Sequence, residues 1–223
     1  MNILEEIEEL LKDFNHNTNE EFNIDSIRIT FNKRYKINKI KNSGNWKKLQ
    51  KNSNILNKLK RRLSDSQITS VYKLEEQNIY FFNSSTPPKY NQATLVIFGM
   101  KQYHKEPPPR KTITKLLKIV KDITNIDLCV DLTSKPNIRA LEQYFNLNQY
   151  IVPTNGIITD THYINQTNYT MIEKIIIYNK ALKNNLSLPL WRIEAKISIP
   201  NIKYLALPLS EFKEIIDIAR IKE

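Results

Sequence analysis

Three segments of the chain alternate polar and apolar side chains, as strands with one covered face do. They are residues 125–132 (NIDLCVDL), 172–180 (IEKIIIYNK) and 190–199 (LWRIEAKISI). Their reactive or charged side chains that share a face are Asp127 and Asp131, then Lys174, Tyr178 and Lys180, then Arg192, Glu194 and Lys196. If the three strands are neighbours, one face of a sheet holds carboxylates, cations and a tyrosine together.

Such a face fits chemistry on a phosphodiester. Asp127, Asp131 and Glu194 could converge as the oxygen ligands that Mg²⁺ or Mn²⁺ prefers, and the ion would neutralise charge that develops in an in-line displacement. The hydroxyl of Tyr178 could be the nucleophile and form a phosphotyrosyl intermediate. Lys180 and Arg192 could then hold the non-bridging oxygens or lower the pKa of the tyrosine.

Each of these signals also has a purely structural explanation. The two aspartates could be polar positions of a half-solvated strand, and Arg192 and Glu194 could form an ion pair that is worth little at a surface. Tyr178 is one of 11 tyrosines and could be a packing residue. The combination, and no single residue, favours an active site.

The rest of the chain has the elements of an α+β fold. Helices are expected at residues 2–14, 112–123 and 210–221, and a first strand at 24–31. Because strands outnumber helices, we expect a two-layer arrangement, with a mainly antiparallel sheet, helices on one face and an open, DNA-facing side. Only three glycines are present, which excludes a dinucleotide-binding fingerprint and a phosphate-binding loop.

Two parts are predicted along the chain. Residues 1–65 would hold the N-terminal helix, the first strand and a basic segment, and residues 66–223 would form one continuous catalytic α+β core, which the family resemblance given below makes a core of the nicking type. A single cysteine excludes a disulfide framework, and the acidic N-terminal segment is unlike a signal peptide. These features predict a cytoplasmic protein with no membrane partner.

The charge of the chain points to a polyanionic partner. There are 34 Lys and Arg against 23 Asp and Glu, which gives a net charge of +11. Codon bias of an AT-rich genome would also enrich Lys, Asn and Ile, so the net charge alone does not decide. Residues 33–62 form a basic, Asn-rich stretch of which only the end is predicted to be helical. The candidate phosphate contacts are Lys58, Lys60, Arg61 and Arg62 in that stretch, and Lys174, Arg192 and Lys196 on the open face.

The order of the motifs resembles the Rep-trans family, the replication initiators of small rolling-circle plasmids and their phage relatives. The motifs are ATLVIFG at 93–99, IDLCVDL at 126–132, HYIN at 162–165, IYNK at 177–180 and RIE at 192–194. The resemblance implies a metal-dependent enzyme that nicks and rejoins one DNA strand at an origin and stays joined to the 5′ phosphate through tyrosine. It favours Tyr178 as the nucleophile, with Tyr163 second, and assigns Asp127, Asp131 and Glu194 to the metal.

Other functions remain open at this point. The expected substrate is an origin duplex or hairpin and its single strand, and candidate partners are a host helicase and a second copy of the chain. The alternative is a non-catalytic DNA-binding protein of replication or recombination on the same scaffold. A binder that stacks single-stranded bases is disfavoured, because the expected open face is mainly charged.

Overall fold

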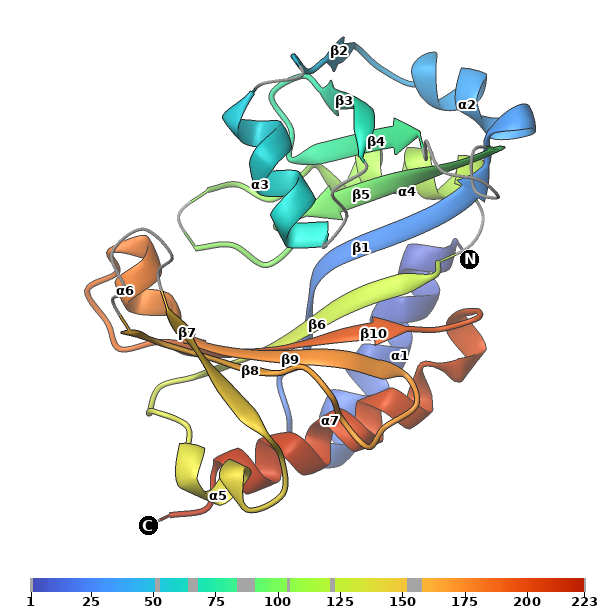
Figure 1. Cartoon of the computed structure of the whole chain (residues 1–223). Coiled ribbons are helices and arrows are strands. Elements are labelled where there is room, and N and C mark those ends of the chain that lie inside the picture. Colours follow the sequence, from blue (N-terminus) through green and yellow to red (C-terminus); the bar gives the residue numbers. More distant parts are fainter. Residues whose placement is uncertain are drawn as a thin grey trace. The chain divides into compact units, whose positions relative to one another are not determined.

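The computed structural model describes residues 2–50, 53–63, 68–83, 91–103, 105–120, 123–151 and 158–222 (Figure 1). By its internal packing the chain divides into two units. The first unit comprises Met1–Ile7 and Ser26–Thr124, and the second comprises Glu8–Asp25 and Asn125–Glu223. The predicted functional division at residue 65 stays a prediction, and it groups the residues differently from this packing.

The first unit is built on an antiparallel sheet with the strand order β2-β3-β4-β5-β1. The strands are β1 (Asn23–Asn32, of which Ser26 onward belongs here), β2 (Trp46–Lys48), β3 (Thr69–Leu74), β4 (Ile79–Asn83) and β5 (Gln92–Phe98). The helices are α2 (Lys33–Lys41), α3 (Asn54–Leu63) and α4 (Arg110–Val120). Of these, α2 lies in the basic stretch where no helix was expected.

Both faces of this first sheet are covered. On one face, Leu56 and Leu59 of α3 pack into a core with Tyr80 and Phe82 of β4 and with further residues of β3 and β5. Phe81, which points to the opposite face, is fully buried and contacts the rings of neighbouring strands.

The strands of the second unit pair antiparallel with one another, in the order β6-β10-β9-β8-β7. The strands are β6 (Asn125–Leu132), β7 (Leu147–Ile151), β8 (Ile158–Ile164), β9 (Ile172–Asn179) and β10 (Trp191–Ser198). The helical segments are α1 (Ile3–Thr18, of which Glu8 onward belongs here), α5 (Ile138–Glu142), α6 (Lys180–Asn184), η2 (Ile202–Tyr204) and α7 (Ala206–Ala219). Antiparallel strands with separate helices confirm the predicted α+β class.

One face of the second sheet is covered, and the other is more open. Helix α7 lies along the sheet (Figure 1), and its Phe212 and Ile216 are fully buried, as are Ile193 and Ile197 of β10. The alternate residues of β10 from Glu194 to Ser198 are only half-buried. Among the described helices, none is long and apolar enough to cross a membrane.

Candidate active site

The strand register brings the predicted residues to one face of the second unit. Strand β10 lies between β6 and β9, so the three alternating segments are neighbours, which was the condition for a shared face. Three rows cross these strands, and they read Asp131–Arg192–Tyr178, then Cys129–Glu194–Ile176, then Asp127–Lys196–Lys174. Paired residues in an antiparallel sheet point to the same side. The predicted gathering of carboxylates, cations and a tyrosine is therefore confirmed.

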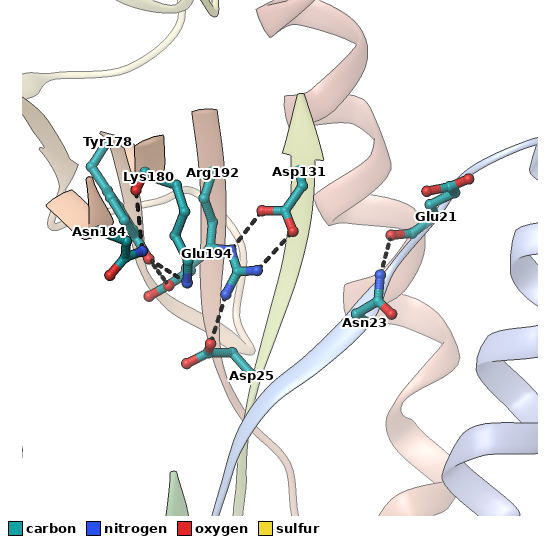
Figure 2. Close-up of polar contacts among 9 residues, drawn as sticks. All are labelled: Glu21, Asn23, Asp25, Asp131, Tyr178, Lys180, Asn184, Arg192 and Glu194. Atoms are coloured by element: carbon teal, nitrogen blue, oxygen red, sulfur yellow. Dashed lines mark hydrogen bonds and ion pairs between the residues drawn. The ribbon is translucent and has the colours of Figure 1, made fainter. Parts of the chain in front are cut away.

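Arg192 lies at the centre of the face and has no exposed surface. Its Nε and Nη2 atoms donate to the two carboxylate oxygens of Asp131 at 2.6 and 2.7 Å, and its Nη1 atom donates to Asp25 at 2.9 Å (Figure 2). Burial alone would lower the pKa of Arg192, but the hydrogen bonds to Asp131 and the charges of the acidic groups around it together raise the pKa above its usual value. The guanidinium is thus a permanent buried cation.

The sequence assigned Arg192 to DNA contacts, and the structure gives this side chain a different position. It lies on the predicted face but is covered there, paired with two carboxylates, and no part of it is at the surface. Asp25 was not predicted to take part in the site. It lies near the start of β1, in a segment for which the sequence predicted only a strand. What distinguishes Asp25 in the structure is that its carboxylate is buried and paired with Arg192.

Tyr178 forms the second half of the cluster. Its hydroxyl donates to Glu194 Oε1 at 2.5 Å, and Lys180 Nζ donates to the same hydroxyl oxygen at 3.5 Å (Figure 2). Burial, and then the charge of Glu194, raise the pKa of Tyr178 far above its usual value. Burial and the nearby Arg192 lower the pKa of Lys180. The tyrosine therefore keeps its proton at neutral pH, with a carboxylate bound to it as an acceptor.

A short helix places Lys180 beside Tyr178. Asn179 caps α6, since its side chain accepts a hydrogen bond from the backbone N–H of Leu182 at 2.8 Å. Asn185 ends the helix in the left-handed conformation. The motif IYNK thus combines a tyrosine, a helix cap and a buried lysine.

Tyr163 lies on the same face, one strand farther away. It pairs with Ile176, in the row of Glu194, and is half-buried. Lys174 Nζ lies 4.1 Å from the centre of its ring. Burial raises the pKa of Tyr163, with smaller contributions from Tyr150 and Glu194. Its exposure is greater than that of Tyr178, which is 4% exposed.

The predicted metal ligands share the face but do not form a metal site. Within the described part of the chain, no three His, Cys, Asp or Glu side chains could hold one ion. Asp131 is bound by Arg192, Glu194 accepts from Tyr178, and Asp127 lies in the row of Lys196. The carboxylates as placed therefore do not fit a divalent cation. Cys129 is fully buried, and burial raises its pKa well above the usual value, so it is a packing residue.

The other predicted DNA contacts are divided between the units. Lys174 and Lys196 are half-buried on the open face of the second unit. Lys58, Lys60 and Arg62 lie on α3 of the first unit, where the Arg62 guanidinium is 3.8 Å from the centre of the Phe98 ring. The side chain of Arg61 lies outside the described residues.

Comparison with solved structures finds similar chains. No protein-family model matches the chain, and no curated protein matches it. A solved structure of a rolling circle replication initiator protein from Geobacillus stearothermophilus is 11% identical, with a TM-score of 0.41, over 86% of this chain and 79% of that one. This similarity is too low to assign the chain to the Rep-trans family, which stays a prediction.

Proposed function

We propose that the chain cleaves and rejoins one strand of DNA through a covalent 5′-phosphotyrosine, as an initiator of rolling-circle replication does. The proposal depends chiefly on one observation, the hydrogen bond from the Tyr178 hydroxyl to Glu194 with Lys180 beside it. A nucleophile bonded to a base, with a cation at its side, is the arrangement that nucleophilic catalysis needs. The similarity to the Geobacillus protein is too weak to add to this.

The proposed chemistry is a transesterification. As Tyr178 Oη attacks the phosphorus atom, its proton passes to Glu194, and the bond between phosphorus and the 3′ oxygen breaks. The 3′ oxygen leaves as a hydroxyl after taking up a proton, and we assign the donation of this proton to the ammonium group of Lys180. The 5′ phosphate stays on the tyrosine, and the reverse reaction rejoins the strand. Because the pKa of Tyr178 is raised, the reaction requires this base.

Arg192 has a positioning role in the proposal. It is paired with Asp25 and Asp131, and it follows Trp191 and precedes Glu194 by two residues on β10. A fixed guanidinium at this place holds the end of β6 against β10 and keeps the base in register with Tyr178. The predicted need for Mg²⁺ or Mn²⁺ stays a prediction, and no step is assigned to a metal because the carboxylates do not fit one.

A second candidate function is DNA binding without cleavage, as in an accessory factor of replication or recombination. The observation that favours it is the burial of Tyr178, whose exposed fraction is 4%. A nucleophile must reach a phosphorus atom, so a covered hydroxyl has to become accessible when DNA binds. The predicted helicase and homodimer partners are common to both functions.

The experiment is a search for a covalent protein–DNA adduct. Supercoiled DNA of the parent replicon is incubated with the protein, with Mg²⁺, with Mn²⁺ or with a chelator, and the products are separated on a denaturing gel. Mass spectrometry then locates the adduct. We expect it in the wild type and in Tyr144→Phe, an exposed control, and not in Tyr178→Phe.

The outcomes separate the alternatives. An adduct that persists in Tyr178→Phe and disappears in Tyr163→Phe moves the nucleophile to the more exposed tyrosine. Cleavage that continues in the chelator would show that no divalent ion is needed. DNA binding without an adduct under any of these conditions would refute cleavage and favour the second function.

A further inference from the structure

The basic charge of the chain is concentrated in one unit. The first unit has 22 Lys and Arg against 7 Asp and Glu, a net charge of +15, whereas the second has 12 against 16, a net charge of −4. Codon bias would enrich lysine throughout the chain and would not separate it in this way. The positive charge of the first unit therefore indicates that this unit has an anionic partner.

The helices show the same separation. Helices α2, α3 and α4 of the first unit contain no Asp or Glu. Helix α7 of the second unit has three acidic residues and one lysine. Basic helices without acidic neighbours on the same helix gain nothing from ion pairs along their length. Repulsion between their lysines is relieved when an anion binds.

Helices α2 and α4 lie side by side. Lys36 Nζ of α2 donates to the backbone carbonyl of Val120 at the end of α4, at 2.5 Å. Lys115 Nζ of α4 donates to the carbonyl of Ser43, just after α2, at 2.7 Å. Two direct contacts, one from each helix, make their outer sides one continuous surface, which we call the α2–α4 surface.

The α2–α4 surface has exposed lysines on both helices, and those of α4 recur on one side of the helix. They are Lys39 and Lys41 on α2, and Lys111, Lys115 and Lys118 on α4. The three lysines of α4 are four and three residues apart, so they form one stripe about 10 Å long at ~1.5 Å per residue. Duplex DNA has one phosphate per ~3.4 Å along each strand, so the stripe spans about three. Arg110 is left out because it lies near Glu5.

We propose that the α2–α4 surface binds the phosphate backbone of duplex DNA. The surface belongs to the unit that does not contain the tyrosines, and the inference rests on the proposed function only in taking DNA as the polyanion. Binding through backbone phosphates needs cations at fixed positions and no reading of bases. Two packed helices hold their lysines at such positions.

Other polyanions fit this surface less well. A helix that binds at a membrane surface must bury its apolar side in the lipid. On α4 that side is Ile113, Leu116, Leu117 and Val120, and it is already buried in the protein. Single-stranded nucleic acid is usually held by aromatic rings that stack on bases, and α4 has no aromatic residue.

The test compares a variant that lacks the three charges of the lysine stripe with a control that lacks three lysine charges in the second unit. The variant is Lys111→Gln/Lys115→Gln/Lys118→Gln, and its control is Lys12→Gln/Lys203→Gln/Lys222→Gln, three exposed lysines of the second unit. Fluorescence anisotropy measures the affinity for a short duplex between about 50 and 200 mM salt. Both are made on Tyr178→Phe, so that binding is measured without cleavage.

We expect the stripe variant to lose about three phosphate contacts. The slope of log K against log salt concentration should become less steep by about 2.7, because each contact contributes ~0.9. The control should keep the wild-type slope. If the stripe variant does not fold, Lys111→Gln/Lys118→Gln tests the same stripe and leaves the contact between Lys115 and Ser43 in place, with an expected change of about 1.8.

Three results would overturn the proposal. Equal changes in slope for the stripe variant and its control would show that net charge alone matters. If the stripe variant lost affinity for a single strand of the same length but not for the duplex, the surface would be assigned to single-stranded DNA. If the stripe variant lost affinity for phosphatidylserine vesicles but not for the duplex, the surface would be assigned to membranes. If no covalent adduct forms but the stripe variant still has the less steep salt dependence, cleavage is refuted and DNA binding by the α2–α4 surface is not. The two proposals can therefore fail separately.

Discussion

Replacing Arg192 with leucine should be among the most destabilising single changes in the second unit. The side chain has no exposed surface, and its partners Asp25 and Asp131 are only 4% and 11% exposed. Arg192→Leu leaves both carboxylates buried without their cation, and breaking a buried pair on one side costs about 3–5 kcal/mol. At ~2–4 °C per kcal/mol for a chain of this size, the midpoint of thermal unfolding should fall by about 6–20 °C.

The assay can follow the second unit by itself. The chain has two tryptophans, Trp46 in the first unit and Trp191 next to Arg192. In a Trp46→Phe background the fluorescence of Trp191, which is 6% exposed, reports unfolding of the second unit in urea or on heating. Arg192→Lys is a matched control. Lysine keeps the charge but not the two parallel hydrogen bonds to Asp131, so we expect an intermediate loss.

A third variant decides whether charge is the cause. Asp25→Asn/Asp131→Asn/Arg192→Leu removes both carboxylate charges together with the cation, and it should recover much of the stability lost in Arg192→Leu. The reasoning would be refuted by an Arg192→Leu cost below about 1 kcal/mol, the value of an exposed ion pair. It would also be refuted by a triple variant as unstable as the single one, since packing and not charge would then explain the loss.

Three further predictions concern single groups. Burial and Glu194 raise the pKa of Tyr178 above 10, so the stability that this group contributes is present below about pH 10 and is lost as the pH rises beyond it. In Tyr178→Phe, the temperature of the unfolding midpoint should therefore fall less steeply with pH above about 10. Burial lowers the pKa of His162 below 6.5, so the stability that this group contributes is present above about pH 6.5 and is lost as the pH falls. His162→Asn should remove this loss of stability at acid pH, whereas His16→Asn, at an exposed site, should not. Asn179→Ala removes the cap of α6 and should cost about 1 kcal/mol in urea unfolding, whereas Asn184→Ala, at the end of the same helix, should cost less.

The shared face could be predicted because it depends on local patterns. Alternation in three short segments fixed which side chains point together, and the pairing of β10 with β6 and β9 confirmed it. The partners within the face could not be predicted in this way. The sequence suggested Arg192 and Glu194 as an ion pair, because they are two residues apart on one strand. The register instead sets Arg192 against Asp131 and leaves Glu194 to Tyr178.

Asp25 and α2 show where tertiary structure decides. Asp25 lies 167 residues from Arg192 in the sequence, so only the fold can bring the two together. Helix α2 (KRYKINKIK) has few apolar residues and a weak helical pattern, which is why residues 33–41 were not predicted to be helical. Its contacts with α4, such as the bond from Lys36 to Val120, add stability that local propensity does not have.

The separation of charge between the units has a consequence for catalysis. The second unit, with a net charge of −4, does not attract a polyanion at long range, whereas the first unit does, over a Debye length of about 10 Å at 0.1 M salt. The contact between Tyr178 and Glu194 is largely buried and so is little screened. If the first unit binds DNA and the second cleaves it, added salt should raise KM for DNA and leave kcat nearly unchanged. A kcat that falls with salt in parallel would place the salt-sensitive contacts in the transition state, and so in the second unit.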